Sequence, residues 1–370
     1  MSLRFHVLAV PHTISTPEYS SCAFTQKVVK LCKMLKAEGH EVIHYGNVLS
    51  KVNCDENVVC TRGEDLKKSY PGHDWRKSGF PNFAKTDHCY KTFYERAIVE
   101  IGVRKQPGDF LLCTFGDWHK PVADAHPDMI VVESGIGYPN GAFAQFRVYE
   151  SYAIMHAYQG NVAALSASNS FWYDAVIPNS FDLDDFEFSA LAKKQESYLL
   201  FLGRLNSGKG LHIAMQLAVR TNIPLVIAGA GEHEMPTELI SYAGNVGPEK
   251  RKRLLRDARA TICASTFLEP FCGVQIESML SGTPVISSDR GAFAEYNLQG
   301  ETGFRCRTFE QFEWAVRNIH KIDRNACRAW AEQCSLEAVG PRYTDYFQSV
   351  KDIYGGAGWY EPRPDRTRLF

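Results

Sequence analysis

The segment TICASTFLEPFCGVQIESMLSGTPVIS, residues 261–287, carries the strongest structural signal in the chain. An apolar run at 261–265 has the length of a buried strand, and the helical spacing over 274–280 stops at Gly282. A second apolar run follows Pro284. Strand, loop, helix and strand in this order form the repeating unit of a parallel sheet, so we expect an α/β fold.

The same alternation recurs along the chain. Most strand-like runs are followed by Gly, Ser or Pro; they lie at 5–10, 42–45, 110–115, 129–132, 198–202, 225–228, 261–264 and 285–287, with helical patterns at 23–37, 211–221 and 248–258. Because the runs are continuously apolar rather than alternating, we expect helices on both faces of the sheets, as in doubly wound Rossmann-like domains. Such domains bind ligands at the carboxyl ends of their strands.

The length of the chain, 370 residues, is sufficient for two such domains. A polar and acidic segment at 182–197 precedes a strong strand, so we place the domain boundary there. The predicted domains are residues 1–185 and 186–339. Residues 54–91 combine Gly, Pro, Lys and Asp with little periodicity, and we expect a long loop or an excursion of the first domain there.

Composition narrows the classes of function. With 41 basic and 42 acidic residues the net charge is -1, so no global field would attract nucleic acid. Eleven cysteines without a Cys-x-x-Cys pair indicate reduced thiols, which favours a soluble, cytoplasmic protein. The lysine-rich helix at 23–37 allows at most a peripheral membrane contact, and an ordinary solvated helix face explains it better.

Two cations follow the strand expected at 198–202, within GRLNSGKG, residues 203–210. Arg204 and Lys209 are predicted at the carboxyl edge of the second sheet, where two cations suit a pyrophosphate. A surface turn with solvated charges is the alternative when this segment is considered alone.

Two competing nucleotide motifs are incomplete. The spacing of residues 203–210 resembles a P-loop, but Gly210 replaces the Ser or Thr that binds Mg²⁺, which argues against an NTPase. The sequence LVIAGAG at 225–231 resembles a dinucleotide fingerprint, yet Glu234 stands where its third small residue belongs. A tight turn at the end of a strand is the better interpretation of this second motif.

Two glutamates of the central segment, Glu269 and Glu277, are separated by seven residues. Glu269 falls on the loop before the helix expected at 274–280, and Glu277 lies one turn inside it. Because residues four apart share a helix face, Glu277 is predicted beside the unpaired backbone amides near Gly273. Such amides and the helix dipole are suited to bind a diphosphate.

Taken in order, these segments resemble the retaining GT-B glycosyltransferases of the family 4 type, and the resemblance suggests a member encoded by a large DNA virus. The resemblance covers about residues 177–303, and only general pattern supports it in the N-terminal half. The segments that carry it are IPNSFD at 177–182, GRL at 203–205, KG at 209–210, GAG at 229–231, GNV at 244–246, EPFCG at 269–273, Glu277 and SGTPV at 281–285.

The resemblance implies roles for individual residues. Arg204 and Lys209 would neutralise the diphosphate of the donor and act in catalysis, and Glu269 would hold hydroxyls of the transferred hexose. Glu277 would accept hydrogen bonds from the ribose. The remaining donor contacts would come from Gly203, Cys272, Gly273 and Val274, with Asn245 and Val246 at the nucleobase.

The implied reaction moves a hexose from a UDP- or GDP-sugar to a glycan or another hydroxyl acceptor, with retention of configuration. Catalysis would rest on stabilising the departing diphosphate. A divalent metal is not indicated, because the Asp182, Asp184 and Asp185 group falls in the presumed linker. The final helical pattern, 340–370, would cross back onto the first domain as in the family.

Two departures concern the first domain. Cys22 and Ala23 stand where the family commonly has paired glycines after the first strand. The segment Glu133-Ser134-Gly135 stands where the family commonly has a histidine near the sugar. Ser134, His156 and His119 are therefore weaker candidates for the sugar side of the site.

Three alternatives remain open at the level of sequence. A sugar-nucleotide epimerase of the same fold also cleaves a glycosyl–diphosphate bond. A glycosidase would use two carboxyl groups, but Arg204 and Lys209 have no role in it. A non-catalytic module that only binds sugar nucleotides would keep the cleft and transfer nothing.

Overall fold

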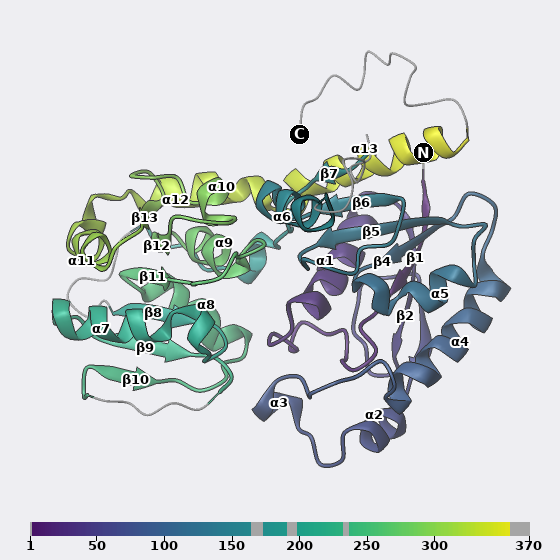
Figure 1. Cartoon of the computed structure of the whole chain (residues 1–370), viewed down its shortest axis with the longest axis horizontal. Helices are drawn as coiled ribbons and strands as arrows, with labels where there is room; N and C mark the ends of the chain where they lie inside the picture. Colours follow the sequence, from purple (N-terminus) through teal and green to yellow (C-terminus); the bar gives the residue numbers. More distant parts are fainter. Residues whose placement is uncertain (1, 164–172, 191–197, 232–236, 356–370) are drawn as a thin grey trace. The chain divides into compact units, whose positions relative to one another are not determined.

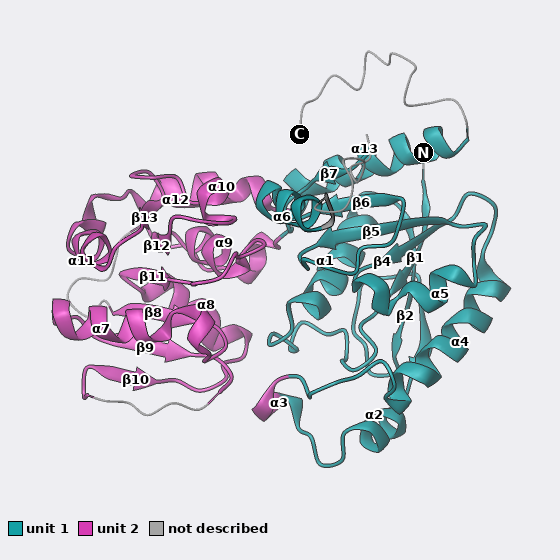
Figure 2. Cartoon of the chain, in the orientation of Figure 1, with its two compact units in different colours: residues 1–75, 80–180, 336–370 teal, residues 76–79, 181–335 magenta. Residues whose placement is uncertain are grey.

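The computed structural model describes residues 2–163, 173–190, 198–231 and 237–355. The chain forms two compact units (Figure 2), divided after Ser180 and after Ser335. Unit 1 comprises Met1–Trp75, Phe80–Ser180 and Leu336–Phe370, and unit 2 comprises Arg76–Gly79 and Phe181–Ser335. No helix of the described residues is long and apolar enough to cross a membrane.

Unit 1 is built on a parallel sheet of seven strands in the order β3-β2-β1-β4-β5-β6-β7 (Figure 1). The strands are β1 (Arg4–Leu8), β2 (Glu41–Asn47), β3 (Glu56–Thr61), β4 (Phe110–Cys113), β5 (Ile130–Ile136), β6 (Phe146–Tyr149) and β7 (Ala175–Val176). The helices are α1 (Ala23–Ala37), α2 (Gly63–Ser69), α4 (His88–Arg104), α5 (Lys120–Asp124), α6 (Tyr152–Ala163) and α13 (Leu336–Tyr354), with η1 at Gly116–Trp118.

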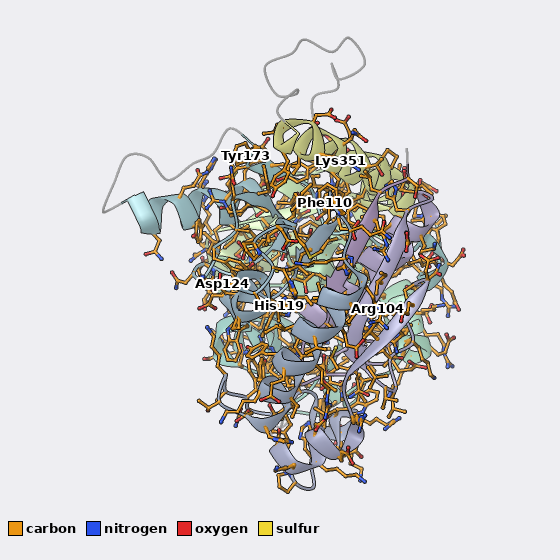
Figure 3. All side chains as sticks on the ribbon, turned by 90° about the vertical axis from the view of Figure 1, so that its right-hand side faces the viewer. Arg104, Phe110, His119, Asp124, Tyr173 and Lys351 are labelled. Carbon is orange, nitrogen blue, oxygen red and sulfur yellow. The ribbon has the colours of Figure 1, made fainter. Side chains whose placement is uncertain are left out.

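Alternate residues of these strands enter two separate cores. Phe110 and Leu112 of β4 pack with apolar residues of α1 and α13, whereas Leu111 and Cys113 pack with α4 and α5. This is the period of two expected when a strand is covered on both faces. Figure 3 shows how densely side chains fill unit 1 around the labelled Phe110 and His119, both of which are buried.

Unit 2 has a parallel sheet of six strands in the order β10-β9-β8-β11-β12-β13. The strands are β8 (Leu199–Leu202), β9 (Leu225–Ala228), β10 (Ile240–Tyr242), β11 (Ala260–Cys263), β12 (Val285–Ser288) and β13 (Gly303–Cys306). The helices are α7 (Leu211–Thr221), α8 (Pro248–Asp257), α9 (Gly273–Leu280), α10 (Phe293–Tyr296), α11 (Phe309–Asn318) and α12 (Arg324–Ala331); the short α3 (Trp75–Ser78) falls mostly in this unit. Short 3₁₀ turns complete it at η2 (Leu183–Asp185), η3 (Ser207–Lys209), η4 (Ile319–Lys321) and η5 (Glu332–Cys334).

The predicted doubly wound α/β fold is confirmed by these parallel sheets. The loop predicted at 54–91 is wrong, because this segment contains β3, α2, α3 and the start of α4. β3 escapes the pattern search because it is an edge strand, where polar residues such as Glu56 and Asn57 replace a continuous apolar run. Glu234 and residues 356–370 of the predicted last helix lie outside the described residues.

Candidate functional site

The loop after β8 is pressed against the end of β11. Gly210 adopts φ 73°, and a Cβ atom at this residue would stand 2.1 Å from the carbonyl oxygen of Ala264. Only glycine fits both the left-handed conformation and this close approach. Asn206 begins η3, and its side-chain oxygen accepts a hydrogen bond of 3.0 Å from the amide of Lys209. The loop therefore holds the Lys209 backbone beside the neighbouring strand.

Lys209 and Glu269 meet at this edge of the sheet. The Lys209 Nζ atom donates to Glu269 Oε1 at 2.5 Å, and Ser265 Oγ donates to the same oxygen at 2.5 Å. Glu269 is buried, and the Lys209 side chain is 24% exposed. Lys209 also lies 5.0 Å from the centre of the Phe267 ring. The two residues predicted to act on diphosphate and hexose are therefore brought together.

The electrostatics of the pair keep the lysine charged. Burial alone would lower the pKa of Lys209, but the neighbouring Cys272 and Glu269 outweigh it, and the pKa is raised. The backbone of Glu269 is held as well, because its carbonyl oxygen accepts a hydrogen bond of 3.0 Å from the amide of Ala292. The charged Lys209 and the carboxylate of Glu269 are therefore held next to each other at the carboxyl edge of the sheet.

Helix α9 begins beside this pair. Cys272 is its N-cap residue, and the first backbone amides of the helix, at Gly273 and Val274, have no partner within the helix. The Oε1 atom of Glu277 lies 3.9 Å from the position that a Cβ atom on Gly273 would occupy. Glu277 is therefore beside the first turn of α9, as the helical spacing predicts.

Glu277 pairs with a residue that the sequence analysis did not select. Arg251 of α8 donates through Nε to Glu277 Oε2 at 2.9 Å and forms a second, shorter contact through its other nitrogen. From sequence alone, the basic run 250–253 indicates only a surface cluster on a helix. The missed signal is the spacing between Arg251 and the buried Leu255, which puts both on the inner face of α8.

The remaining candidates of unit 2 follow the neighbouring strands. Gly203 follows β8, and a Cβ atom on Gly229 after β9 would meet the Gly203 carbonyl at 1.9 Å, so the two turns nest. After β10, the carbonyl of Gly244 accepts a hydrogen bond of 2.9 Å from the Gly229 amide. Asn245 and Val246 come next, half-buried and buried respectively. Arg204 is exposed on the loop after β8.

The candidates of unit 1 are not part of this cluster in unit 2. Ser134 is buried in β5, and its hydroxyl has no hydrogen-bond partner among the described residues. His156 is exposed on α6. His119 is fully buried, where Nδ1 accepts from the Thr114 amide at 3.2 Å and Nε2 lies 3.1 Å from the Ala9 carbonyl. Because both nitrogens are engaged and burial lowers the pKa of His119 to about 4, this ring supports the fold.

Within the described ranges, no group of three or more His, Cys, Asp or Glu side chains is arranged to hold a metal ion. Asp182 caps the turn η2 by accepting a hydrogen bond from the Asp184 amide at 3.2 Å. The site is therefore described by cations, carboxylates and helix amides alone, and its independence of metal stays a prediction.

Residues 183–334 match the protein family described as glycosyl transferases group 1. Two sequence relatives match about half of this chain. A lipopolysaccharide 1,2-N-acetylglucosaminetransferase of Salmonella typhimurium is 26% identical over 48% of this chain and 57% of its own length. An uncharacterized glycosyltransferase of Methanocaldococcus jannaschii is 30% identical over 50% of each chain. This chain thus spans about half the length of the curated relatives it matches.

Solved structures resemble the chain over nearly its whole length. A glycosyltransferase involved in avilamycin A biosynthesis gives a TM-score of 0.65 at 19% identity and covers 96% of this chain and 99% of its own. The Anabaena protein HepE, in complex with UDP and glucose, gives 0.66 at 14% identity over 94% and 100%. The chain has the GT-B fold, and the part that matches group 1 glycosyltransferases lies within unit 2.

Proposed function

We propose that this protein is a glycosyltransferase that moves a hexose from a nucleoside-diphosphate sugar to a glycan or another hydroxyl acceptor. The observation that carries the proposal is the Lys209–Glu269 pair beside the first amides of α9. The pair and these amides lie within residues 183–334, the segment that matches the group 1 glycosyltransferases. UDP- and GDP-sugars are the proposed donors; the structural neighbour HepE was crystallised with UDP and glucose.

The proposed catalytic mechanism follows from the charge that develops as the donor loses its sugar. Breaking the bond between sugar and diphosphate leaves negative charge on the departing group, and preorganised donors lower the energy of that state. Lys209, Arg204 and the amides of Gly273 and Val274 are the donors that would do so. Glu269 would then exchange part of its interaction with Lys209 for hydroxyls of the hexose.

We assign the binding of the donor's nucleoside to a second carboxylate, that of Glu277. Glu277 would accept hydrogen bonds from the ribose, with its carboxylate oriented by Arg251. Gly203, Cys272, Asn245 and Val246 would complete the donor contacts through backbone atoms, the last two at the base. The acceptor would bind unit 1, where Ser134 and His156 stay weaker candidates.

Several narrower features belong to the same proposal. We infer retention of configuration from the resemblance to family 4 glycosyltransferases and a cytoplasmic location from the reduced cysteines. We infer a reaction without a required metal because Asp182, Asp184 and Asp185 fall in the presumed linker. A nucleic-acid partner is not proposed, and membrane contact is at most peripheral. The relatives named above come from bacteria and an archaeon, so an origin in a large DNA virus stays a prediction.

The test is a panel of UDP-, GDP- and ADP-sugars, incubated with the full chain with and without a divalent metal. We expect release of free nucleoside diphosphate from one class of donor, and loss of that release in the Lys209→Ala variant. Product analysis by NMR separates transfer from epimerisation, because an epimerase returns an altered sugar nucleotide. Failure of every donor to bind or react, in a folded protein, would contradict the proposal.

A further inference from the structure

A group of aromatic side chains lies at the carboxyl edge of the sheet in unit 1. The strand order β3-β2-β1-β4-β5-β6-β7 means that the direction of winding reverses between β1 and β4. Doubly wound sheets bind ligands outside the carboxyl ends of their strands at such a switch point. Phe24 lies in the first turn of α1, which follows β1, and Phe115 and Trp118 follow β4. These rings therefore lie where a sheet of this order binds a ligand.

The rings contact one another and remain partly accessible. The centre of the Phe115 ring lies 5.1 Å from that of Phe24 and 5.5 Å from that of Trp118. Phe83, from the segment before α4, is 5.2 Å from Trp118, and Tyr138, which follows β5, is 6.1 Å from Phe24. Phe115 is buried, whereas the other four are half-buried. We call these five residues the ring cluster.

Hydrogen bonds hold the ring cluster in place. The Tyr138 hydroxyl donates to Glu133 Oε1 at 2.7 Å, and the other oxygen of this buried carboxylate accepts two backbone hydrogen bonds of 2.8 Å from the same loop. The Trp118 carbonyl accepts a hydrogen bond of 2.7 Å from the Tyr94 hydroxyl. A ligand would thus meet rings that are already positioned, which lowers the entropy cost of binding.

An exposed ion pair borders the ring cluster. Lys85 Nζ donates to Asp117 Oδ2 at 2.7 Å and lies 5.2 Å from the centre of the Trp118 ring. The two side chains are 45% and 44% exposed. Asp117 also lies beside the loop that follows Tyr138, because a Cβ atom on Gly141 would stand 3.1 Å from Asp117 Oδ1. One hydrogen-bond donor and one acceptor, with balanced charges, therefore lie next to the rings.

We propose that the ring cluster and the Lys85–Asp117 pair bind a neutral sugar ring, which makes the acceptor a glycan. Its assignment as the acceptor rests on the proposed function. A pyranose presents C–H groups of slightly positive charge on its faces, and these suit the negative face of an aromatic ring. Its hydroxyls both donate and accept hydrogen bonds, as the ammonium and the carboxylate of the pair require.

The charges of the site argue against two other classes of ligand. An anionic ligand gains little, because the Lys85 cation is already neutralised by Asp117. An apolar chain would cover the rings but would desolvate the two charges without offering them a hydrogen bond. A sugar satisfies the rings and the pair together, so it is the ligand that this combination favours.

The first experiment is saturation-transfer NMR on the full chain without nucleotide. The probes are the methyl glycosides of glucose, galactose, mannose and N-acetylglucosamine, together with octyl glucoside. We expect saturation of the ring C–H protons of at least one methyl glycoside. Saturation confined to the octyl chain would identify a site for apolar chains and overturn the proposal. Absence of saturation in every probe, with a folded protein, overturns it as well.

Matched variants locate the bound glycoside. Trp118→Ala should weaken binding by roughly tenfold, the upper range for one aromatic contact, and Trp118→Phe should recover most of the affinity. Trp314→Ala, at an exposed tryptophan of unit 2, should bind like the unaltered protein. Asp117→Ala should weaken binding by roughly three- to tenfold. Its control is Asp124→Ala, which removes an exposed carboxylate paired with Lys120. Unchanged affinity in both Trp118→Ala and Asp117→Ala overturns the proposal.

A kinetic measurement separates the acceptor site from the proposed function. Release of nucleoside diphosphate by the unaltered protein tests the proposed function alone, and its failure leaves glycoside binding intact. Where a donor reacts, the bound glycoside should receive the sugar, and Trp118→Ala should raise its KM by roughly tenfold with a much smaller change in kcat. A bound glycoside that is never glycosylated, or an unchanged KM, overturns the acceptor assignment.

Discussion

The two units of this chain place ionisable side chains in opposite ways. Unit 1 buries six histidines, and it encloses an ion pair between Lys27 and Glu150; the histidines are His6, His12, His40, His44, His119 and His126. In unit 2 the described histidines are exposed, and the pairs formed by Glu269 and Glu277 keep partly exposed cations at the carboxyl edge of the sheet. Each of the six buried histidines of unit 1 hydrogen-bonds to another group of that unit, whereas the two cation–carboxylate pairs of unit 2 stay partly exposed.

The largest expected difference is in the response to acid. Burial lowers the pKa of His12 to about 3, and that of His44 and His119 to about 4. Each ring stays neutral in the folded state, while the unfolded chain binds a proton near pH 6.5. Stability is therefore lost as pH falls from about 6.5 towards 4, by roughly 1.4 kcal/mol per pH unit for each ring.

Peptide-resolved hydrogen exchange on the whole chain would check this expectation. Between pH 7 and pH 5, after correction for intrinsic rates, β1 and β4 of unit 1 should lose protection before β8 and β11 of unit 2. If β8 and β11 lost protection before β1 and β4, unit 1 would not be the more acid-sensitive of the two units.

The buried ion pair gives the next largest effect. Lys27 donates to the Gly135 carbonyl at 2.8 Å and contacts the carboxylate of Glu150, which is 4% exposed. Lys27→Met removes the cation from a buried carboxylate, and we expect the free energy of unfolding to fall by about 3–5 kcal/mol. Urea unfolding of the variant and the unaltered protein measures this fall in the free energy of unfolding. The double variant Lys27→Met/Glu150→Leu should recover much of the loss, and equal losses in both would argue against the ion pair as the cause.

The cations of unit 2 are expected to affect activity rather than stability. Lys209→Ala or Arg204→Ala should lower donor turnover on the order of 10² to 10³, as removal of one preorganised donor does elsewhere. Steady-state kinetics of nucleoside-diphosphate release measures the loss. Lys120→Ala is the matched control, because Lys120 forms an exposed pair with Asp124 that should matter little. Near-normal turnover in both site variants would refute the assignment.

The smallest expected effect concerns the strain at Cys272. Cys272→Gly should raise the free energy of unfolding by about 1 kcal/mol, because glycine accepts a φ angle of 61° without the Cβ clash. Cys272→Ala keeps the Cβ atom and should give no gain. Thermal unfolding of the two variants compares them directly, and equal stability would show that the backbone at this residue is unstrained.

Much of the fold was predictable from apolar periodicity. The bounds of α1, α7 and β9 agree with the sequence pattern to the residue, because each is a compact apolar run with a clear stop. Short edge strands were missed: β10 has three residues, of which only Ile240 is buried, and β13 contains Gly303 and a half-buried arginine. Strands of this kind are held by their neighbours rather than by their own pattern.

The candidate site was predictable where spacing alone fixes geometry. Helical spacing correctly puts Glu277 beside Gly273, and the parallel sheet brings Lys209 to Glu269. The Arg251 partner was missed because its neighbours Lys250 and Arg253 suggest a solvated surface. Contacts between side chains on different helices depend on packing angles, which the linear pattern does not contain.

The most direct test of the central claim is a crystal structure of the full chain with a bound nucleoside diphosphate. The account predicts the pyrophosphate at Lys209 and the amides of Gly273 and Val274, with the ribose at Glu277. A nucleotide bound away from these residues, with the Lys209–Glu269 pair undisturbed, would contradict it.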